Sequence, residues 1–132
     1  MMEKLLSPDS IHPTFGNYSH GIEVQHIDTL VLTSGQLGIS KDGAIPEKAS
    51  DQARICFENI QAILEQSQLS MNDVVQLRAY VTDRDYFTDY MRIRDEFLEG
   101  RKITSTLLIV SGFTRPEFKV EVEALAIKQN SI

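Results

Sequence analysis

Residues 103–127 read ITSTLLIVSGFTRPEFKVEVEALAI, which is the pattern of two apolar strands joined by a turn. Its first part, residues 103–110, is rich in β-branched residues and leucine, as strands are. Ser111–Gly112 and then Pro116 supply residues that are typical of turns. From Phe118 onward, apolar side chains alternate with others at a period of two, which is the pattern of a strand with one buried face. The stretch therefore predicts two strands that pair as a long hairpin.

The second of these strands has two unlike faces. The side chains expected to face the core are Phe118, Val120, Val122, Ala124 and Ala126. Those on the opposite face are Lys119, Glu121, Glu123, Leu125 and Ile127. The two carboxylates on that face lie ~7 Å apart because alternate residues of a strand share a side. Since apolar residues follow them, this face is expected to line an interface or a pocket.

Further strands are expected upstream of this stretch. One lies near Lys4–Leu6. Tyr18–Gln25 alternates weakly and leads through a turn at Ile27–Asp28 into Thr29–Ser34, which predicts a second hairpin. The segment Gly35–Ile39 follows, and its two glycines permit backbone geometry that is closed to other residues. That segment is a candidate pocket wall.

Two amphipathic helices are also expected. The first covers about Lys48–Ser67, where apolar residues recur at helical spacing. The second begins after Asp83, a good N-cap, and ends at Gly100. Between the helices, residues 74–81 alternate as a strand does. The side chains expected on the buried face of that strand are Val75, Leu77, Ala79 and Val81.

Composition limits the classes of partner. The chain has 132 residues, the size of a single domain, so residues 1–132 are expected to form one unit. Its formal charge of -6 disfavours nucleic acid, because phosphate binding needs clustered Lys and Arg.

The one cysteine, Cys56, cannot form an internal disulfide, and no apolar run approaches the ~20 residues that cross a bilayer. Without a leader at Met1 either, a cytoplasmic protein with no membrane partner is expected. The histidines, His12, His20 and His26, lack the spacing of a metal site.

These elements define an α+β fold. The expected arrangement is a single sheet of about six strands with both helices packed on one face. A chain of 132 residues leaves no third layer for the other face. Self-association through that face would cover it, so a homo-oligomer is expected.

The order and spacing of several short motifs give the chain a resemblance to the RidA/YjgF family of reactive-intermediate imine deaminases. The matching segments are Gly16–Ser19, Thr33–Gln36, Gln52–Arg54 with Asn59–Ile60, Asp73–Val75 with Val81–Asp83, and Val120–Ala124. The resemblance implies a chorismate-mutase-like fold and a homotrimer whose sheets form a central barrel. It also implies a small-molecule ligand in each cleft between neighbouring subunits. The implied activity is hydrolysis of 2-imino or 2-enamino acids to 2-oxo acids and ammonia, with no metal or cofactor.

The resemblance also assigns site residues. Glu121 matches the family glutamate that positions the attacking water, and Thr106 stands where the family has an arginine that binds the substrate carboxylate. The chain would thus be a member that lacks this arginine. The residues expected to bind substrate are Tyr18, Ser34, Gly35, Gln36, Phe87, Met91, Arg94 and Ser105. Arg94 is either a relocated positive charge for the pocket or a solvated helix arginine.

Three functions follow from this resemblance. The first is a deaminase that does not depend on the usual pair of carboxylate and arginine. The second is a non-catalytic trimer that binds or senses a small metabolite. The third, an endoribonuclease or translation inhibitor, is disfavoured by the acidic composition.

Overall fold

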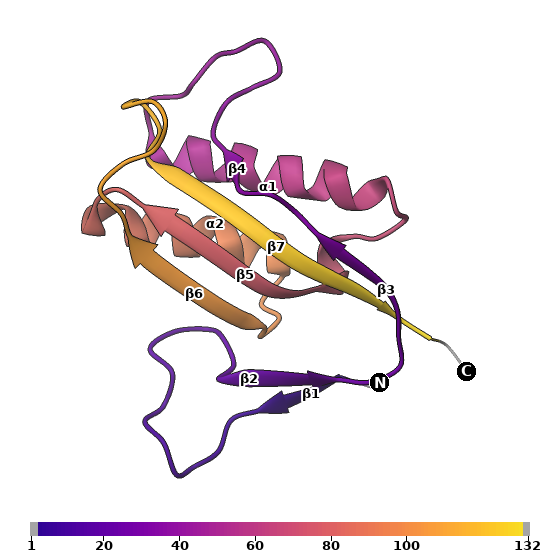
Figure 1. Ribbon diagram of the computed structural model, residues 1–132. Coiled ribbons are helices and arrows are strands. Elements are labelled where there is room, and N and C mark those ends of the chain that lie inside the picture. The colour runs from indigo at the N-terminus through magenta and orange to yellow at the C-terminus, as the bar shows by residue number, and fades with distance from the viewer. Residues whose placement is uncertain (1–2, 131–132) are drawn as a thin grey trace.

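The computed structural model describes residues 3–130 as two helices and two sheets (Figure 1). The strands are β1 (Glu3–Leu6), β2 (Gly21–Val24), β3 (Ile27–Leu32), β4 (Gln36–Leu37), β5 (Val74–Val81), β6 (Thr104–Ile109) and β7 (Val120–Gln129). The helices are α1 (Ala49–Glu65) and α2 (Phe87–Leu98), with the 3₁₀ turns η1 (Met71–Asp73) and η2 (Arg84–Tyr86). The predicted α+β class and both predicted helices are confirmed.

The strands do not form the single six-stranded sheet that was expected. β1 and β2 make a separate two-stranded sheet, and the larger sheet has the order β3-β7-β5-β6, with β4 also paired to β7. In the sequence, β2 leads to β3 with only two residues between them. The predicted hairpin between them is nevertheless wrong, because β2 pairs with β1 and β3 pairs with β7.

The long hairpin predicted at residues 103–127 is also wrong in its pairing. Both strands exist, but β6 pairs with β5 in parallel and β7 pairs with β5 antiparallel, so β5 lies between them. The physical reason is α2, which carries the chain from the end of β5 back to the start of β6. A crossover helix of this kind returns the chain parallel to the strand that it left. β7 then takes the free side of β5.

The hydrophobic core lies between the two helices and one face of the larger sheet, and Figure 1 shows both helices behind that sheet. The predicted core face of β7 is confirmed, since Phe118, Val120, Val122, Ala124 and Ala126 are all buried. On β5 the core residues are Val74, Leu77, Ala79 and Val81. Val75 is buried outside this core cluster, because the pairing of β5 with β7 shifts between Val74 and Gln76.

Gln52 joins α1 to the start of β7 and is fully buried. Its amide nitrogen donates to the carbonyl oxygens of Pro46 at 2.8 Å and Glu117 at 2.9 Å. Its amide oxygen accepts from the backbone N–H of Lys119 at 2.8 Å. A Cβ on Gly38 would lie 2.4 Å from the Cβ of Gln52, so a glycine is needed where the chain passes this side chain. This contact fixes the segment after β4 against α1.

Candidate functional site

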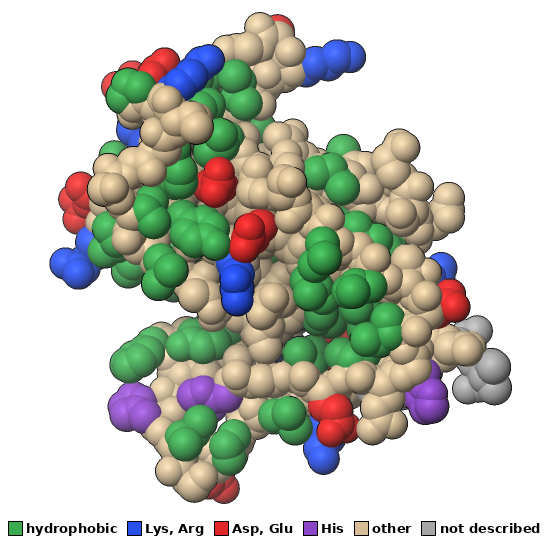
Figure 2. Space-filling model, in the orientation of Figure 1, with side chains coloured by type: hydrophobic (Ala, Val, Ile, Leu, Met, Phe, Trp, Pro, Cys, Tyr) green, Lys and Arg blue, Asp and Glu red, His purple; other side chains and the backbone are tan. Residues whose placement is uncertain are grey.

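The helices leave the other face of the larger sheet uncovered along most of its length. We call the face that bears Gln76, Arg78, Tyr80, Glu121 and Glu123 the open face. At one end the β1–β2 hairpin approaches it and encloses a mainly apolar hollow of about 430 Å³ with β3, β5 and β7. Along the rest of the open face, Figure 2 shows hydrophobic side chains gathered in a patch beside a small group of acidic and basic side chains.

Strand pairing aligns the polar residues of the open face in two rows. In one row, Arg78 on β5 is paired with Glu123 on β7 and, on its other side, with Thr106 on β6. In the next row, Tyr80 is paired with Glu121. Neighbouring strands lie ~4.8 Å apart, so the side chains of each row rise next to one another. Carboxylate, guanidinium and hydroxyl groups are thereby collected on adjacent strands.

The segment that leaves β3 brings its backbone onto Glu121. Thr33, which follows the end of β3, still bonds to β7: its N–H donates to the carbonyl oxygen of Ala124, and the N–H of Ala124 donates to the Thr33 hydroxyl, both at 3.0 Å. The chain then passes Glu121 so closely that a Cβ on Gly35 would lie 2.6 Å from the Glu121 carboxyl carbon. Any other residue at position 35 would push the carboxyl group away.

The carboxyl group of Glu121 has an altered proton affinity. Burial raises the pKa of Glu121, and the charge of the neighbouring Glu123 raises it further. Glu123 is itself held by the hydroxyl of Tyr80, which donates to its Oε1 at 3.1 Å. A raised pKa makes a carboxylate a stronger base, which suits a role in taking protons during a reaction.

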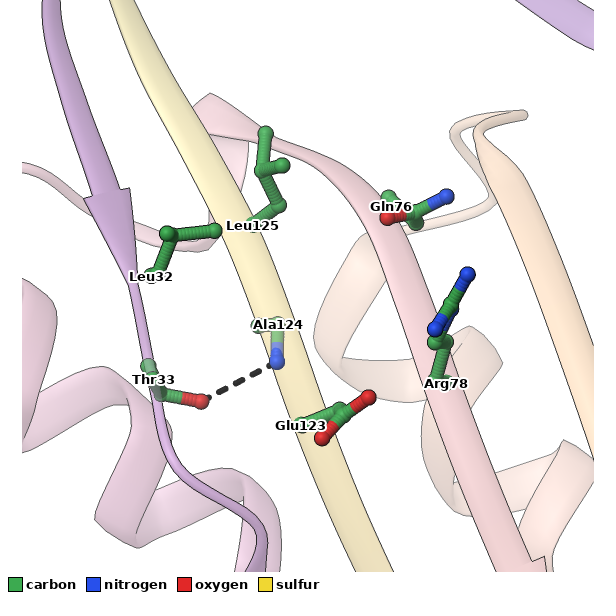
Figure 3. Close-up of a pocket in the computed structure, with 7 residues that line it drawn as sticks. All are labelled: Leu32, Thr33, Gln76, Arg78, Glu123, Ala124 and Leu125. Carbon is green, nitrogen blue, oxygen red and sulfur yellow. Dashed lines mark hydrogen bonds between the residues drawn. The ribbon is translucent and has the colours of Figure 1, made fainter.

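A hollow of about 350 Å³ opens beside these rows (Figure 3). Its walls are Leu32, Thr33, Gln76, Arg78, Glu123, Ala124 and Leu125. Figure 3 shows the side chains of Arg78 and Glu123 rising from neighbouring strands, with Leu32 and Leu125 further along. The hollow therefore combines a cation, an anion and an apolar wall in a space that fits a small molecule.

Gln76, Arg78 and Tyr80 are residues of this site that sequence reasoning missed. The alternation of residues 74–81 was used only to find the buried side of that strand. The same alternation puts Gln76, Arg78 and Tyr80 together on the other side, next to the face that carries Glu121. Applying the period of two to both sides of the strand would have found them.

Several predicted site residues lie on the helix side of the sheet, away from Glu121. Phe87 and Met91 on α2 are partly buried against the core. Arg94 is 3% exposed, and its guanidinium donates to the hydroxyl of Ser105 at 3.3 Å and to Asp95 at 3.1 Å. Arg94 is thus neither a solvated arginine nor a cation on the open face of this chain.

The remaining predicted residues divide between two places. Ser34, Gly35 and Gln36 lie at the Glu121 end of the open face, and the backbone carbonyl of Gln36 accepts from the Cys56 thiol at 3.1 Å. Tyr18 lies elsewhere, in a hollow of about 460 Å³ beneath the loop between β1 and β2. Its hydroxyl accepts from the backbone N–H of Phe15 at 3.3 Å.

Within residues 3–130, no group of three or more His, Cys, Asp or Glu side chains is placed to hold a metal ion. Neither of the helices described there is long and apolar enough to cross a membrane.

Comparison with known proteins gives relatives along nearly the whole chain. A 2-iminobutanoate/2-iminopropanoate deaminase of Salmonella typhimurium is 28% identical over 131 residues, which cover 97% of this chain and 100% of the relative. The crystal structure of Escherichia coli TdcF with bound serine is 26% identical with a TM-score of 0.72, covering 96% of this chain and 99% of that one. The Rid-family protein YyfB of Yersinia pestis has a TM-score of 0.84 and covers 97% and 100%. Because its identity is 22%, it shows the fold alone.

The family itself is shown by a match to a family model. Residues 9–128 match the family model described as Endoribonuclease L-PSP, so nearly the whole chain is covered. The relatives at 28% and 26% identity are a 2-iminobutanoate/2-iminopropanoate deaminase and TdcF. The chain therefore belongs to the RidA/YjgF family.

Proposed function

We propose that this protein is a hydrolytic deaminase of reactive 2-imino or 2-enamino acids. The observation that carries the proposal is Glu121, whose carboxyl group has a raised pKa and lies against the backbone at Gly35. The 28% identity to a 2-iminobutanoate/2-iminopropanoate deaminase of Salmonella typhimurium supports this choice of substrate class. The bound serine of Escherichia coli TdcF, at 26% identity, supports a small ligand that carries a carboxylate.

The reaction consumes one water, and both protons of that water end on the nitrogen. The oxygen of water forms a bond to C2 of the imine while Glu121 takes one proton and passes it to the nitrogen, which gives a carbinolamine. The same carboxylate then takes the proton of the new hydroxyl group and passes it to the nitrogen, so that C2=O forms, the C2–N bond breaks, and ammonia leaves the 2-oxo acid. A raised pKa suits these steps, because it makes the carboxylate of Glu121 a stronger base than an ordinary glutamate when it takes each proton.

We propose that the working form is a homotrimer with a ligand site in each cleft between subunits. The open face supports this, since Leu30 and Leu32 of β3 are 54% and 67% exposed and adjoin Leu125. A neighbouring subunit would cover these side chains. Such a neighbour would also supply groups that a single chain keeps away from Glu121, namely Tyr18 and the α2 residues Phe87 and Met91. The location of the protein is proposed to be cytoplasmic, in keeping with its one unpaired cysteine, Cys56.

A non-catalytic metabolite-binding trimer is the second candidate. Thr106 favours it, because a hydroxyl cannot balance the charge of a substrate carboxylate as a guanidinium does. The endoribonuclease activity in the family description is not proposed, since a net charge of -6 opposes binding to RNA.

The deaminase is tested by generating 2-iminobutanoate or 2-aminoacrylate enzymatically and following its decay with and without the protein. We expect the protein to accelerate the decay and Glu121→Gln to lower that acceleration by ~100-fold or more, the usual size of a general acid–base contribution. Glu58→Gln, on the exposed side of α1, is the matched control and should keep the wild-type rate. No acceleration with any of several imino acids would leave the metabolite-binding trimer as the better proposal.

A further inference from the structure

We propose that Arg78 is the residue that binds the carboxylate of the ligand, so that the positive charge of this site stands on β5 instead of β6. This inference rests on the proposed ligand class, a small 2-imino or 2-oxo acid. It does not rest on turnover, because a metabolite-binding trimer would use the same contact.

The guanidinium of Arg78 is free to take a ligand. Arg78 is exposed and lines the 350 Å³ hollow of the open face. Among the residues that the structure describes, its side chain forms no hydrogen bond and no ion pair, although Glu123 is its direct partner across β7. Glu123, the acceptor at the paired position on β7, instead accepts a hydrogen bond from the Tyr80 hydroxyl. An arginine that keeps its donors unused beside a hollow is suited to a carboxylate ligand.

Two other cations of the chain, Arg94 and Lys119, are engaged elsewhere. Arg94 is buried on the helix side, where it donates to Ser105 and Asp95. Lys119, two residues before Glu121, donates to the carbonyl oxygen of Glu47 and lies over the ring of Tyr86. Of these three cations, Arg78 is therefore the one that can face a ligand bound next to Glu121.

The geometry also fits the length of the ligand. In a 2-imino acid the carboxylate is bonded directly to the reacting carbon. The protein group that binds the carboxylate and the one that acts at the carbon must therefore face the same small volume. Arg78 pairs with Glu123, and Glu121 is the residue two positions away on the same face of β7. Such diagonal neighbours have Cα atoms ~7–8 Å apart, a gap that a carboxylate and its adjacent carbon can bridge with hydrogen bonds of ~2.9 Å at each end.

Thr106 on the parallel strand β6 lies directly beside Arg78, so the two residues can be exchanged in a double variant. The probe is 2-oxobutanoate, compared by isothermal titration calorimetry with the neutral 2-oxobutanamide. We expect Arg78→Gln to weaken binding of 2-oxobutanoate by ~10-fold or more, the effect of one charged contact. Arg92→Gln, on an arginine that pairs with Asp89 and Glu96 on α2, should leave affinity unchanged. The double variant Arg78→Thr with Thr106→Arg should recover part of the loss.

Wild-type affinity in Arg78→Gln would overturn the proposal, as would failure of the wild-type protein to bind 2-oxobutanoate at millimolar concentration. If Arg78→Gln does not assemble, the wild-type protein still decides: equal affinity for the acid and the amide contradicts a cationic contact. The result is separate from the proposed activity. If ligand binding depends on Arg78 but the protein does not hydrolyse imines, the Arg78 contact is supported and the deaminase activity is rejected. If the rate of hydrolysis is unchanged in Arg78→Gln, the deaminase activity is supported and the Arg78 contact is rejected.

Discussion

The chemistry of the open face comes from single residues whose neighbours change their properties. Glu121 and Glu123 are two positions apart on β7, yet they have different partners. Glu123 accepts a hydrogen bond from Tyr80, whereas Glu121 lies against Gly35. Burial is the first cause of the raised pKa of Glu121, and Glu123 is the second. The two carboxyl groups therefore have different surroundings although they share one face of the strand.

The raised pKa of Glu121 predicts that the stability of the folded protein depends on pH. A carboxyl pKa that is higher in the folded than in the unfolded protein favours folding while the group is protonated. That contribution is complete below the unfolded pKa of ~4.3 and is lost as the pH rises through the raised folded pKa. Glu121→Gln should therefore increase the free energy of unfolding at pH 7 and change it little near pH 4, as measured by urea denaturation. A difference that is the same at both pH values would show that Glu121 does not titrate abnormally.

At the scale of elements, the sequence predicted which segments fold but not how they pair. Apolar residues recur on one side of α1, α2, β5 and β7 at the period of a helix or a strand. This local pattern was enough to predict these four elements. Pairing depends on α2, which forces β6 to lie parallel to β5, and on the separate pairing of β1 with β2. No local pattern in residues 103–127 contains that information. The place of Arg78 on the open face, by contrast, follows from the same period of two that places Leu77 on the buried face.

Gln52 tests how α1 is fixed to the sheet. Its side chain satisfies the carbonyl oxygens of Pro46 and Glu117 and the N–H of Lys119. Gln52→Leu keeps the approximate volume but leaves these three groups without a partner, at ~1–3 kcal/mol for each buried group. We expect a loss of ~3 kcal/mol or more in the free energy of unfolding, measured in urea.

The matched control is Gln61→Leu, because Gln61 is exposed on the same helix. That substitution should change the free energy of unfolding by no more than ~0.5 kcal/mol. Similar losses in both variants would mean that the Gln52 hydrogen bonds add nothing to the packing of α1.

The whole molecule is organised by the contrast between the two faces of its larger sheet. One face is closed by the helices, and the other presents Leu30, Leu32 and Leu125 beside charged groups. Within the single chain, Ile127 is already buried near the β1–β2 hairpin, so only part of the open face remains for a neighbour. If the proposed trimer forms, the hollow beside Arg78 becomes a cleft between subunits, and folding, assembly and ligand binding become linked.

Leu125→Asp tests that linkage. Leu125 is paired with Leu32 on β3 and with Gln76 on β5, so the new carboxylate would stand in the middle of the surface that the trimer is expected to bury. An unpaired charge in such a contact costs several kcal/mol, which should split the trimer or prevent soluble expression. Light scattering at micromolar concentration measures the mass, with Gln61→Asp on the outer side of α1 as a control that should assemble normally. A wild-type mass in Leu125→Asp, or a monomeric mass in the unsubstituted protein, would exclude assembly through the open face. In that case the ligand of Arg78 and Glu121 would have to be held by one chain alone.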